Sequence, residues 1–264
     1  IVQVEKVVTD VDPKLVKVPG IYVDAVVVTE NKENHTQCVG CEYDGSMTGE
    51  FRVPLGSLEA PSLSPKKIIG RRAAMELRPD TVVNLGIGIP GDHFTLTVEA
   101  GPVGGVPQGG PQFGGAVNAQ AILDQPAQFD FYDGGGVDDA FLGLAQADKD
   151  GNINVSKFGP RIAGCGGFVN ITQNAKRVYY CGTFTAGGLK CSTKDGKLII
   201  DQEGKSDKFI DTVEQITFSG KYANKVGQPV MYITERAVFE LREDGVYLTE
   251  VAPGIDIQTQ ILDH

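Results

Sequence analysis

One glutamate, Glu99, closes a short apolar segment and is followed at once by residues with almost no side chain. The sequence there reads Thr97-Val98-Glu99-Ala100-Gly101-Pro102-Val103-Gly104-Gly105. Glycines leave steric room around a carboxylate and bring backbone N–H groups near it. A carboxylate nucleophile needs both features when a bulky acyl group must reach it. The alternative is a solvated strand end, which is the commonest position of an isolated carboxylate. The residues alone leave both interpretations open.

Two other glycine-rich corners offer consecutive backbone N–H donors. They are Asp133-Gly134-Gly135-Gly136-Val137-Asp138 and Arg161-Ile162-Ala163-Gly164-Cys165-Gly166-Gly167-Phe168. Such runs can bind an oxyanion or a phosphate, but for each corner taken singly a simple turn or a close helix–strand contact is the better explanation. Because each corner is expected to follow a strand, the corners together favour one shared site. Cys165 has no recognisable histidine partner, so we predict that it fills space in the packing.

Two further motifs carry weaker predictions. Gly86-Ile87-Gly88-Ile89-Pro90-Gly91 satisfies the dinucleotide pattern G-x-G-x-x-G, but no helix follows that could present its N-terminus to a pyrophosphate. His35, Cys38 and Cys41 have metal-ligand spacing, but they supply only three ligands within a polar segment. We therefore expect a tight turn at the first motif and free thiols at the second.

The elements that must position these residues alternate between strand-like and helix-like segments. Helices are expected from Ser64-Pro65 to Pro79 and over 116–123 and 205–214. Strands are expected over residues 1–8, 21–28, 81–85, 95–98, 129–132, 140–147, 153–155, 178–183, 198–200, 215–218, 231–234, 237–241 and 246–248. Strands interleaved with helices predict an α/β layer architecture.

One connection is too short for this architecture. If the strands that end at Leu85 and Val98 are parallel neighbours, only residues 86–94 join them. A parallel crossover needs about a dozen residues or more. Either the two strands are antiparallel, or the printed sequence lacks residues between Pro90 and Phe94. We favour the second explanation.

Composition limits the possible partners. The chain has 264 residues, with 24 Lys plus Arg against 34 Asp plus Glu, which gives a net charge of −10. Such an acidic surface repels phosphate backbones, and no apolar run is long enough to span a bilayer, so we expect neither nucleic acid nor membrane as a partner. Five cysteines, an odd number, favour free thiols in a reducing cytoplasm. The first residue is Ile1 rather than Met, and we expect a piece of a longer polypeptide.

Four ordered motifs resemble family I CoA-transferases, especially the propionate/acetate branch with fused α-type and β-type halves. They are Asn84-Leu85-Gly86-Ile87-Gly88-Ile89-Pro90, the Glu99 segment, the 133–138 corner, and Gly159-Pro160-Arg161-Ile162-Ala163-Gly164-Cys165-Gly166-Gly167. The resemblance implies a three-layer, open-sheet α/β domain of the β-type half over residues 66–264. Residues 1–30 would be the remnant of the α-type domain, and residues 31–65 the linker.

The resemblance also implies an activity: exchange of CoA between a short-chain acyl-CoA and a free carboxylate. Glu99 matches the glutamate that forms first an acyl anhydride and then a CoA thioester, and Gly135, with Gly134 or Gly136, would donate to the oxyanion. CoA would lie against the glycines of the other motifs. The glycines are Gly86, Gly88, Gly104, Gly105, Gly164, Gly166 and Gly167. Lys157, Arg161 and Lys190 are the expected cations for its phosphates, chosen from charge and not from a motif.

The implied partners are the α-type half of the same enzyme and further copies of the chain in a homo-oligomer. No metal or redox cofactor is implied. Two alternatives stay open: a non-catalytic module of this fold that binds CoA or a phosphorylated metabolite, and a hydrolase in which water captures the same intermediate. The acyl group itself is not fixed by the sequence.

Overall fold

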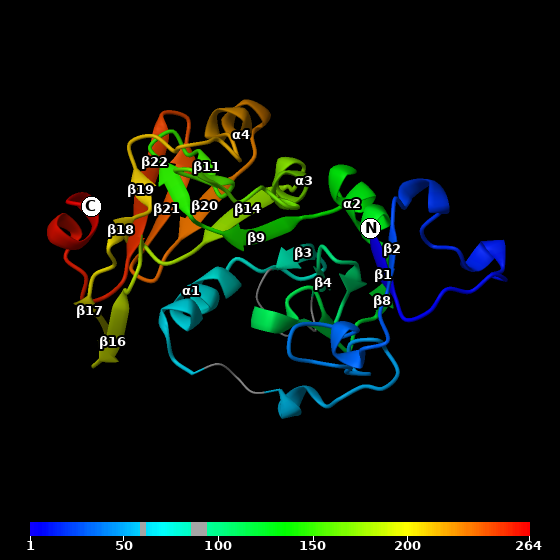
Figure 1. Ribbon diagram of the computed structural model, residues 1–264. Helices are drawn as coiled ribbons and strands as arrows, with labels where there is room; N and C mark the ends of the chain where they lie inside the picture. Colours follow the sequence, from blue (N-terminus) through cyan, green and yellow to red (C-terminus); the bar gives the residue numbers. More distant parts are fainter. Residues whose placement is uncertain (59–61, 86–93) are drawn as a thin grey trace.

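The computed structural model describes residues 1–58, 62–85 and 94–264, and its centre is one mixed β-sheet (Figure 1). Within those residues the sheet has nine strands. Their spatial order is β22 (Gly245–Val251), β21 (Ala237–Arg242), β20 (Val230–Ile233), β14 (Arg177–Cys181), β9 (Asp139–Gly143), β3 (Val82–Leu85), β4 (Thr95–Thr97), β5 (Pro102–Val103) and β8 (Ala121–Ile122).

Five neighbouring strands at the centre of the sheet, β20, β14, β9, β3 and β4, run parallel to one another. The strands at both ends of the sheet pair antiparallel with their neighbours. Val83 of β3 is level with both Leu96 of β4 and Asp139 of β9, which fixes the register across the middle. Segments that follow these parallel strands therefore meet at one edge of the sheet, where open α/β sheets bind ligands.

Helices cover both faces of the sheet (Figure 1). The helices are α1 (Pro65–Ala74), α2 (Gln125–Asp133), α3 (Phe168–Gln173) and α4 (Gly220–Val226). On one face Ile69 and Ala73 of α1 pack with Val83 and Leu96, and on the other Phe168 of α3 packs with residues such as Tyr180. Apolar residues thus alternate between two cores, as the period of two along a strand requires. This confirms the predicted three-layer α/β fold.

Shorter elements surround the central sheet. The small sheets are β1 (Val2–Val4) with β2 (Val26–Val28), β6 (Val106–Pro107) with β7 (Ala116–Val117), β11 (Ile153–Asn154) with β10 (Gln146–Asp148) and β19 (Phe209–Ile210), β12 (Lys157–Phe158) with β13 (Arg161–Ile162), β15 (Thr185–Ala186) with β18 (Ser206–Asp207), and β16 (Lys190–Lys194) with β17 (Lys197–Gln202). Short helical turns cover Pro13–Leu15, Gly20–Tyr22, Lys32–Asn34, Leu55–Ser57, Gly110–Gln112 and Gln258–Leu262. No helix among the described residues has both the length and the apolar character to cross a membrane.

Three local predictions are wrong. The segment 129–132, expected as a strand, lies inside helix α2, which begins after Asp124 and has Pro126 in its first turn. Residues 116–123 and 205–214, expected as helices, hold the short strands β7, β8, β18 and β19 instead. By contrast, Ser64 caps α1 as expected, because its side chain accepts the N–H of Lys67.

The short connection after β3 joins parallel strands. The register pairs Val82 with Thr95 and Asn84 with Thr97 in the same direction, which rules out the antiparallel explanation. The connecting residues 86–93 lie outside the described part of the chain, so the expected tight turn at the G-x-G-x-x-G motif is not described. The expectation that residues are missing after Pro90 stays a prediction at this point.

A buried ion-pair cluster ties the C-terminal end to the sheet. The Arg236 side chain, which is fully buried, donates to Glu235 at 2.7 Å and to Glu203 at 2.8 Å. Its guanidinium also lies 4.9 Å from the ring centroid of Phe184 and donates to the Gln260 carbonyl at 3.0 Å. A buried charge is tolerated only when it is paired and hydrogen-bonded in this way.

This cluster predicts a loss of stability in acid. Burial acts to raise the pKa of Glu203, but hydrogen bonds from Arg236 and Thr185 outweigh it and lower that pKa from 4.5 to about 2. A carboxylate with a depressed pKa in the folded state stabilises the protein above its unfolded pKa, and the contribution is lost as pH falls. We expect the free energy of unfolding to decline between about pH 4.5 and 2, and Glu203→Gln to flatten that decline in urea titrations. An equally steep decline in the variant would contradict the assignment.

Candidate active site

Glu99 lies in the turn that follows β4, at the carboxyl edge of the parallel strands. The turn is closed by hydrogen bonds from Val98 N–H to the Pro102 carbonyl and from Gly101 N–H to the Val98 carbonyl, both 2.9 Å. Gly101 has φ +123°, and a Cβ there would lie 2.0 Å from the Leu123 carbonyl oxygen, so the turn requires glycine. Glu99 is half-buried and makes no hydrogen bond or ion pair with any residue that the structure describes. Its carboxylate is thus available for chemistry.

The Glu99 carboxylate lies against the third glycine-rich corner. A Cβ built on Gly167 would lie 2.8 Å from Glu99 Oε2 and 2.7 Å from Cζ of Phe129. Distances this short leave no room for any side chain at position 167. The structure therefore brings together Glu99, Gly167 and Phe129, three residues that are far apart in the sequence.

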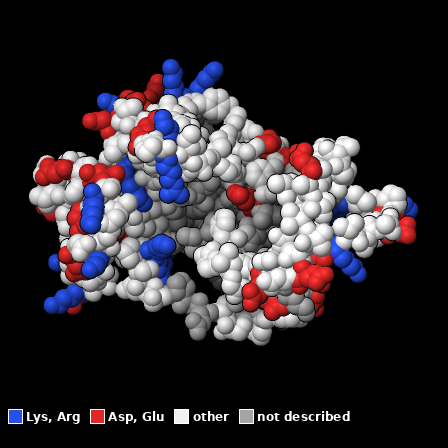
Figure 2. Space-filling view, viewed as in Figure 1, with Lys and Arg blue, Asp and Glu red and all other residues white. Residues whose placement is uncertain are grey.

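The glycines next to Gly167 face open space. Cβ atoms built on Gly164 and Gly166 would meet nothing within 4 Å, and both residues are exposed. In the described part of the chain, no hydrogen bond uses the N–H of Gly166 or Gly167. Gly164 and Gly166 therefore leave the backbone open to a ligand, whereas Gly167 is buried. That CoA binds at these three glycines stays a prediction. Figure 2 shows that this face of the molecule is hollowed over β9, β3 and β4 and that basic side chains gather to the left of the hollow.

The 134–136 corner lies elsewhere. Gly136 precedes β9, whereas Glu99 follows β4, and these two strands are parallel, so the two segments lie at opposite edges of the sheet. The N–H groups of the three glycines donate to the carbonyls of Asp130, Tyr132 and Phe131 at 2.9–3.0 Å, which ends helix α2. The expected oxyanion role of Gly135, with Gly134 or Gly136, came from the family resemblance, and the expectation that this corner shares a site with Glu99 assumed a strand over 129–132. Because α2 replaces that strand, the three N–H groups are already hydrogen-bonded to the end of the helix. They do not share a site with Glu99 in this structure.

The remaining predicted CoA glycines do not gain support. A Cβ on Gly104 would lie 2.7 Å from the Gln120 side chain, and one on Gly105 would lie 2.4 Å from the Val117 carbonyl oxygen. Both glycines have φ +73°, so they shape and pack the turn between β5 and β6. Their expected role as a CoA surface stays a prediction. Gly86 and Gly88 lie outside the described residues.

The predicted cations occupy two exposed hairpins. Lys157 and Arg161 lie on β12 and β13, and Arg161 is only a few residues before the Gly164–Gly167 corner. Lys190 begins β16, on a hairpin at the end of the molecule away from β4 (Figure 1). None of the three forms an ion pair with another described residue. All three are available to an anionic ligand. Only Lys157 and Arg161 are close in sequence to the Gly164–Gly167 corner.

The cysteines are all free. Cys165 is exposed in the glycine corner, which corrects the prediction that it fills space in the packing. His35 pairs with the Thr29 carbonyl, and the backbones of Cys38 and Cys41 form hydrogen bonds with each other. The two cysteine side chains also interact. Among the described residues, no group of three or more His, Cys, Asp or Glu side chains is arranged to hold a metal ion.

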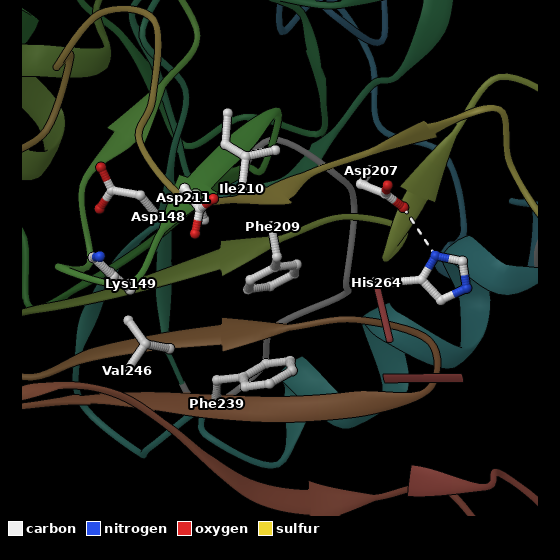
Figure 3. A pocket seen from close by; sticks show the side chains of 10 residues that line it. Asp148, Lys149, Asp207, Phe209, Ile210, Asp211, Phe239, Val246 and His264 are labelled. Carbon is white, nitrogen blue, oxygen red and sulfur yellow. Dashed lines mark hydrogen bonds and ion pairs between the residues drawn. The ribbon is translucent and has the colours of Figure 1, made fainter. Parts of the chain in front are cut away.

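A separate cavity of about 500 Å³ opens beside β10, β19, β21 and β22 (Figure 3). Its walls include Phe209, Phe239 and Val246, with Asp148 at one end and the His264–Asp207 pair at the other. In that pair the Nδ1–Oδ1 distance is 3.0 Å. None of the predicted site residues lines this cavity.

The sequence reasoning missed Phe129, which borders both Gly167 and the glutamate. The signal was misleading rather than absent, because the alternation of apolar and polar residues in Phe129-Asp130-Phe131-Tyr132 imitates a strand. Pro126 and the C-terminal glycines are the features that favour the helix instead.

Fold and site define the class: a three-layer α/β domain with an unpaired carboxylate at the carboxyl edge of its parallel strands. Comparison with known proteins identifies it further. The chain is 47% identical to caffeate CoA-transferase of Acetobacterium woodii over 270 residues, covering 95% of this chain and 51% of that protein. It is 45% identical over 276 residues to acetate CoA-transferase YdiF of Escherichia coli K12, covering 99% of this chain and 51% of the relative. Acetate CoA-transferase subunit beta of the same strain is 28% identical, with 75% of this chain matched to 90% of that subunit.

Solved structures agree. The apoenzyme of the acyl-CoA transferase YdiF from Escherichia coli O157:H7 matches 99% of this chain and 51% of its own chain, at a TM-score of 0.81 and 44% identity. A thioester complex of that transferase with CoA matches at a TM-score of 0.77. The chain therefore belongs to the family I CoA-transferases and is homologous to their β-subunit-like half. No protein-family model matches the chain.

The chain spans about half the length of the full-length relatives, 51% in each case. The alignment with the K12 relative runs over 276 positions, which exceeds the 264 residues of this chain. That relative consequently contains residues with no counterpart here. That the printed sequence lacks residues between Pro90 and Phe94 stays a prediction.

Proposed function

We propose that this chain is the β-type half of an enzyme that moves CoA between a short-chain acyl-CoA and a free carboxylate. The observation that carries the proposal is the unpaired Glu99 carboxylate, held against Gly167 at the carboxyl edge of the sheet. Homology to proteins named caffeate and acetate CoA-transferase supports the same reaction class.

In the proposed mechanism a Glu99 oxygen attacks the carbonyl carbon of the acyl-CoA. The C–S bond breaks, CoA leaves as a thiolate, and an acyl-glutamyl anhydride remains. The thiolate then attacks the glutamyl carbonyl and expels the donor carboxylate, which leaves a glutamyl-CoA thioester. The acceptor carboxylate reverses both steps and regenerates Glu99. Covalent catalysis of this kind divides one difficult exchange into easier steps, each of which keeps an activated acyl bond.

The N–H groups of Gly166 and Gly167 are the proposed donors to the oxyanion that forms in these steps. Gly167 lies against the Glu99 carboxylate, Gly166 is the residue before it, and neither N–H donates to another described residue. One such donor typically contributes about 3–4 kcal/mol of transition-state stabilisation. Arg161 and Lys157, on the hairpin that leads into this corner, are the proposed partners of the CoA phosphates, with Lys190 as a more distant candidate. The carbon–sulfur exchange needs no metal or redox cofactor.

The α-type half of the same enzyme is the proposed partner. The N-terminal part of the chain exposes many apolar side chains, such as Leu15, Ile21 and Tyr22, each at least 70% exposed. Exposed apolar surface of this extent marks an interaction site. We propose that residues 1–30 pack against the α-type half, that residues 31–65 are the connector, and that the assembled enzyme is a cytoplasmic homo-oligomer.

A transfer assay tests the proposal. The full-length protein, including the α-type half, is mixed with acetyl-, propionyl- or butyryl-CoA and isotopically labelled acetate. We expect label to appear in acetyl-CoA with each donor that fits the site. Release of free CoA without labelled acetyl-CoA would instead indicate a hydrolase, and CoA binding without turnover would indicate a binding module.

A further inference from the structure

Directly behind Glu99 lies a cluster of buried polar side chains from three elements. Asn84 lies one residue before the end of β3, Thr97 ends β4, and Gln128 and Tyr132 lie one turn apart on α2. Their exposed fractions are 6%, 1%, 0% and 1%. Burial of polar groups costs free energy unless their hydrogen bonds are satisfied. This concentration of polar side chains next to the reactive glutamate therefore calls for an explanation beyond packing.

The Tyr132 hydroxyl is the centre of the cluster. Its oxygen accepts hydrogen bonds from Asn84 Nδ2 at 3.1 Å and from Gln128 Nε2 at 2.8 Å. These two hydrogen bonds occupy both lone pairs of the phenol oxygen, so the hydroxyl proton points away from both donors. The Thr97 side chain also interacts with the hydroxyl. Asn84 Nδ2 donates in addition to the Thr97 carbonyl at 3.3 Å, and Thr97 Oγ1 donates to the Val83 carbonyl at 3.3 Å. The hydroxyl thus joins the ends of β3 and β4 to helix α2.

The cluster reaches Glu99 by two routes. Thr97 is the last residue of β4, two positions before Glu99, so its placement sets the start of the catalytic turn. Phe129, on the same helix as Tyr132, contacts the Tyr132 ring edge-on at 5.7 Å between centroids and borders the Glu99–Gly167 contact. Burial raises the pKa of Tyr132, and the negative charge of Glu99 raises it further, so the hydroxyl stays protonated. Helix α2 consequently supplies both Tyr132, which contacts the strands that lead to Glu99, and Phe129, which lies beside the Glu99–Gly167 contact.

We propose that Tyr132 is a positioning residue: its hydroxyl binds the end of β4 to β3 and α2 and thereby holds the Glu99 carboxylate in the geometry for attack. This inference rests on the proposed function of Glu99. Loss of the hydroxyl leaves two amide N–H donors unpaired in the interior, which favours a shift of the strand end. A shift of about 1 Å at the reacting group costs about 100-fold in rate.

Tyr132→Phe in the full-length protein tests this role. We expect kcat to fall about 100-fold while the KM for acyl-CoA changes less than threefold, because the CoA contacts are untouched. The rate at which the CoA thioester forms on Glu99 should fall with kcat. A merely structural role would lower the amount of folded enzyme without this split between kcat and KM.

Tyr180→Phe is the matched control. Tyr180 is also fully buried, but its hydroxyl forms no hydrogen bond of ordinary geometry with a described residue and has only a looser interaction with the Thr172 side chain. The same atom is deleted, and we expect kcat to stay within twofold of the parent. Gln128→Met is the second variant, since it removes only one of the two donors to Tyr132 and also removes Gln128 Oε1, which is buried without a described partner. We expect it to fold and to lose about 10-fold in kcat.

The outcomes separate this inference from the proposed function. If the parent protein transfers CoA and Tyr132→Phe keeps kcat within threefold, the positioning role is refuted and the function stands. If Tyr132→Phe does not fold, Gln128→Met decides, and unchanged kcat in that variant refutes the role. If the parent forms no thioester on Glu99, the function itself fails.

Discussion

Replacement of Glu99 by glutamine is expected to reduce CoA transfer by about 10⁴-fold or more, because removal of a covalent nucleophile typically costs several orders of magnitude. An amide keeps the size of the side chain and its place against Gly167, but it lacks the negative charge needed to attack an acyl carbon. The rate of label exchange between acetate and acetyl-CoA measures the effect. The affinity for CoA, measured by titration calorimetry, should stay within a few-fold of the parent.

Glu240→Gln is the control for this substitution. Glu240 is a carboxylate on β21 whose only described ion pair is a loose 3.8 Å contact with Arg242. Its conversion to an amide should leave transfer unchanged. A Glu99→Gln enzyme that kept one tenth of the parental rate would show that another group carries the covalent step.

Introduction of one methyl group at Gly167 is expected to lower kcat about 100-fold, since displacement of a reacting group by about 1 Å has that effect. The new Cβ must occupy space 2.8 Å from Glu99 Oε2 and 2.7 Å from the Phe129 ring, so the carboxylate or the ring must move. Overpacking of this kind also costs about 1–3 kcal/mol of stability. Steady-state kinetics and urea unfolding of Gly167→Ala measure the two effects separately.

Gly70→Ala controls for the general effect of adding a methyl group to a glycine. Gly70 lies inside helix α1, and a Cβ there would meet nothing within 4 Å. Alanine is favoured over glycine in a helix by about 0.5–1 kcal/mol, so this variant should be slightly more stable and fully active. Equal kinetic losses in both variants would contradict a specific contact between Gly167 and Glu99.

The parts of the fold that follow strong local signals were predictable from the sequence. Ser64 followed by Pro65 predicted the start of α1, and the apolar runs before Gly86 and Glu99 predicted β3 and β4. An Asp-Gly pair favours a two-residue hairpin turn, and Asp195-Gly196 joins β16 to β17 with positive φ at both residues, 50° and 74°. These features depend on caps and turns, whose preferences act within a few residues.

The failures occur where tertiary packing decides. The alternation Phe129-Asp130-Phe131-Tyr132 fits a strand, but α2 buries Tyr132 in the core while Phe131 stays exposed, as a helical face requires. This error also affected the expectation that the 133–138 corner and Glu99 share one site, because residues that precede β9 lie at the opposite edge of the sheet from residues that follow β4.

The contact between Glu99 and Gly167 was beyond sequence reasoning for a related reason. Glu99 as the reactive residue followed from its local context and from family resemblance. Its partner did not, since the sheet register that places β4 beside β3, and β3 beside β9, brings residue 99 to the start of α3. Spacing along the chain carries no information on such a register.

The most direct test of a covalent role for Glu99 is identification of the modified residue. The full-length protein is incubated with acyl-CoA, reduced with borohydride, digested and mapped by mass spectrometry. The account predicts that the glutamate of the peptide containing residue 99 is reduced to the alcohol, and that Glu99→Gln gives no such product. Reduction at another residue, or no reduction in an enzyme that actively transfers CoA, would contradict it.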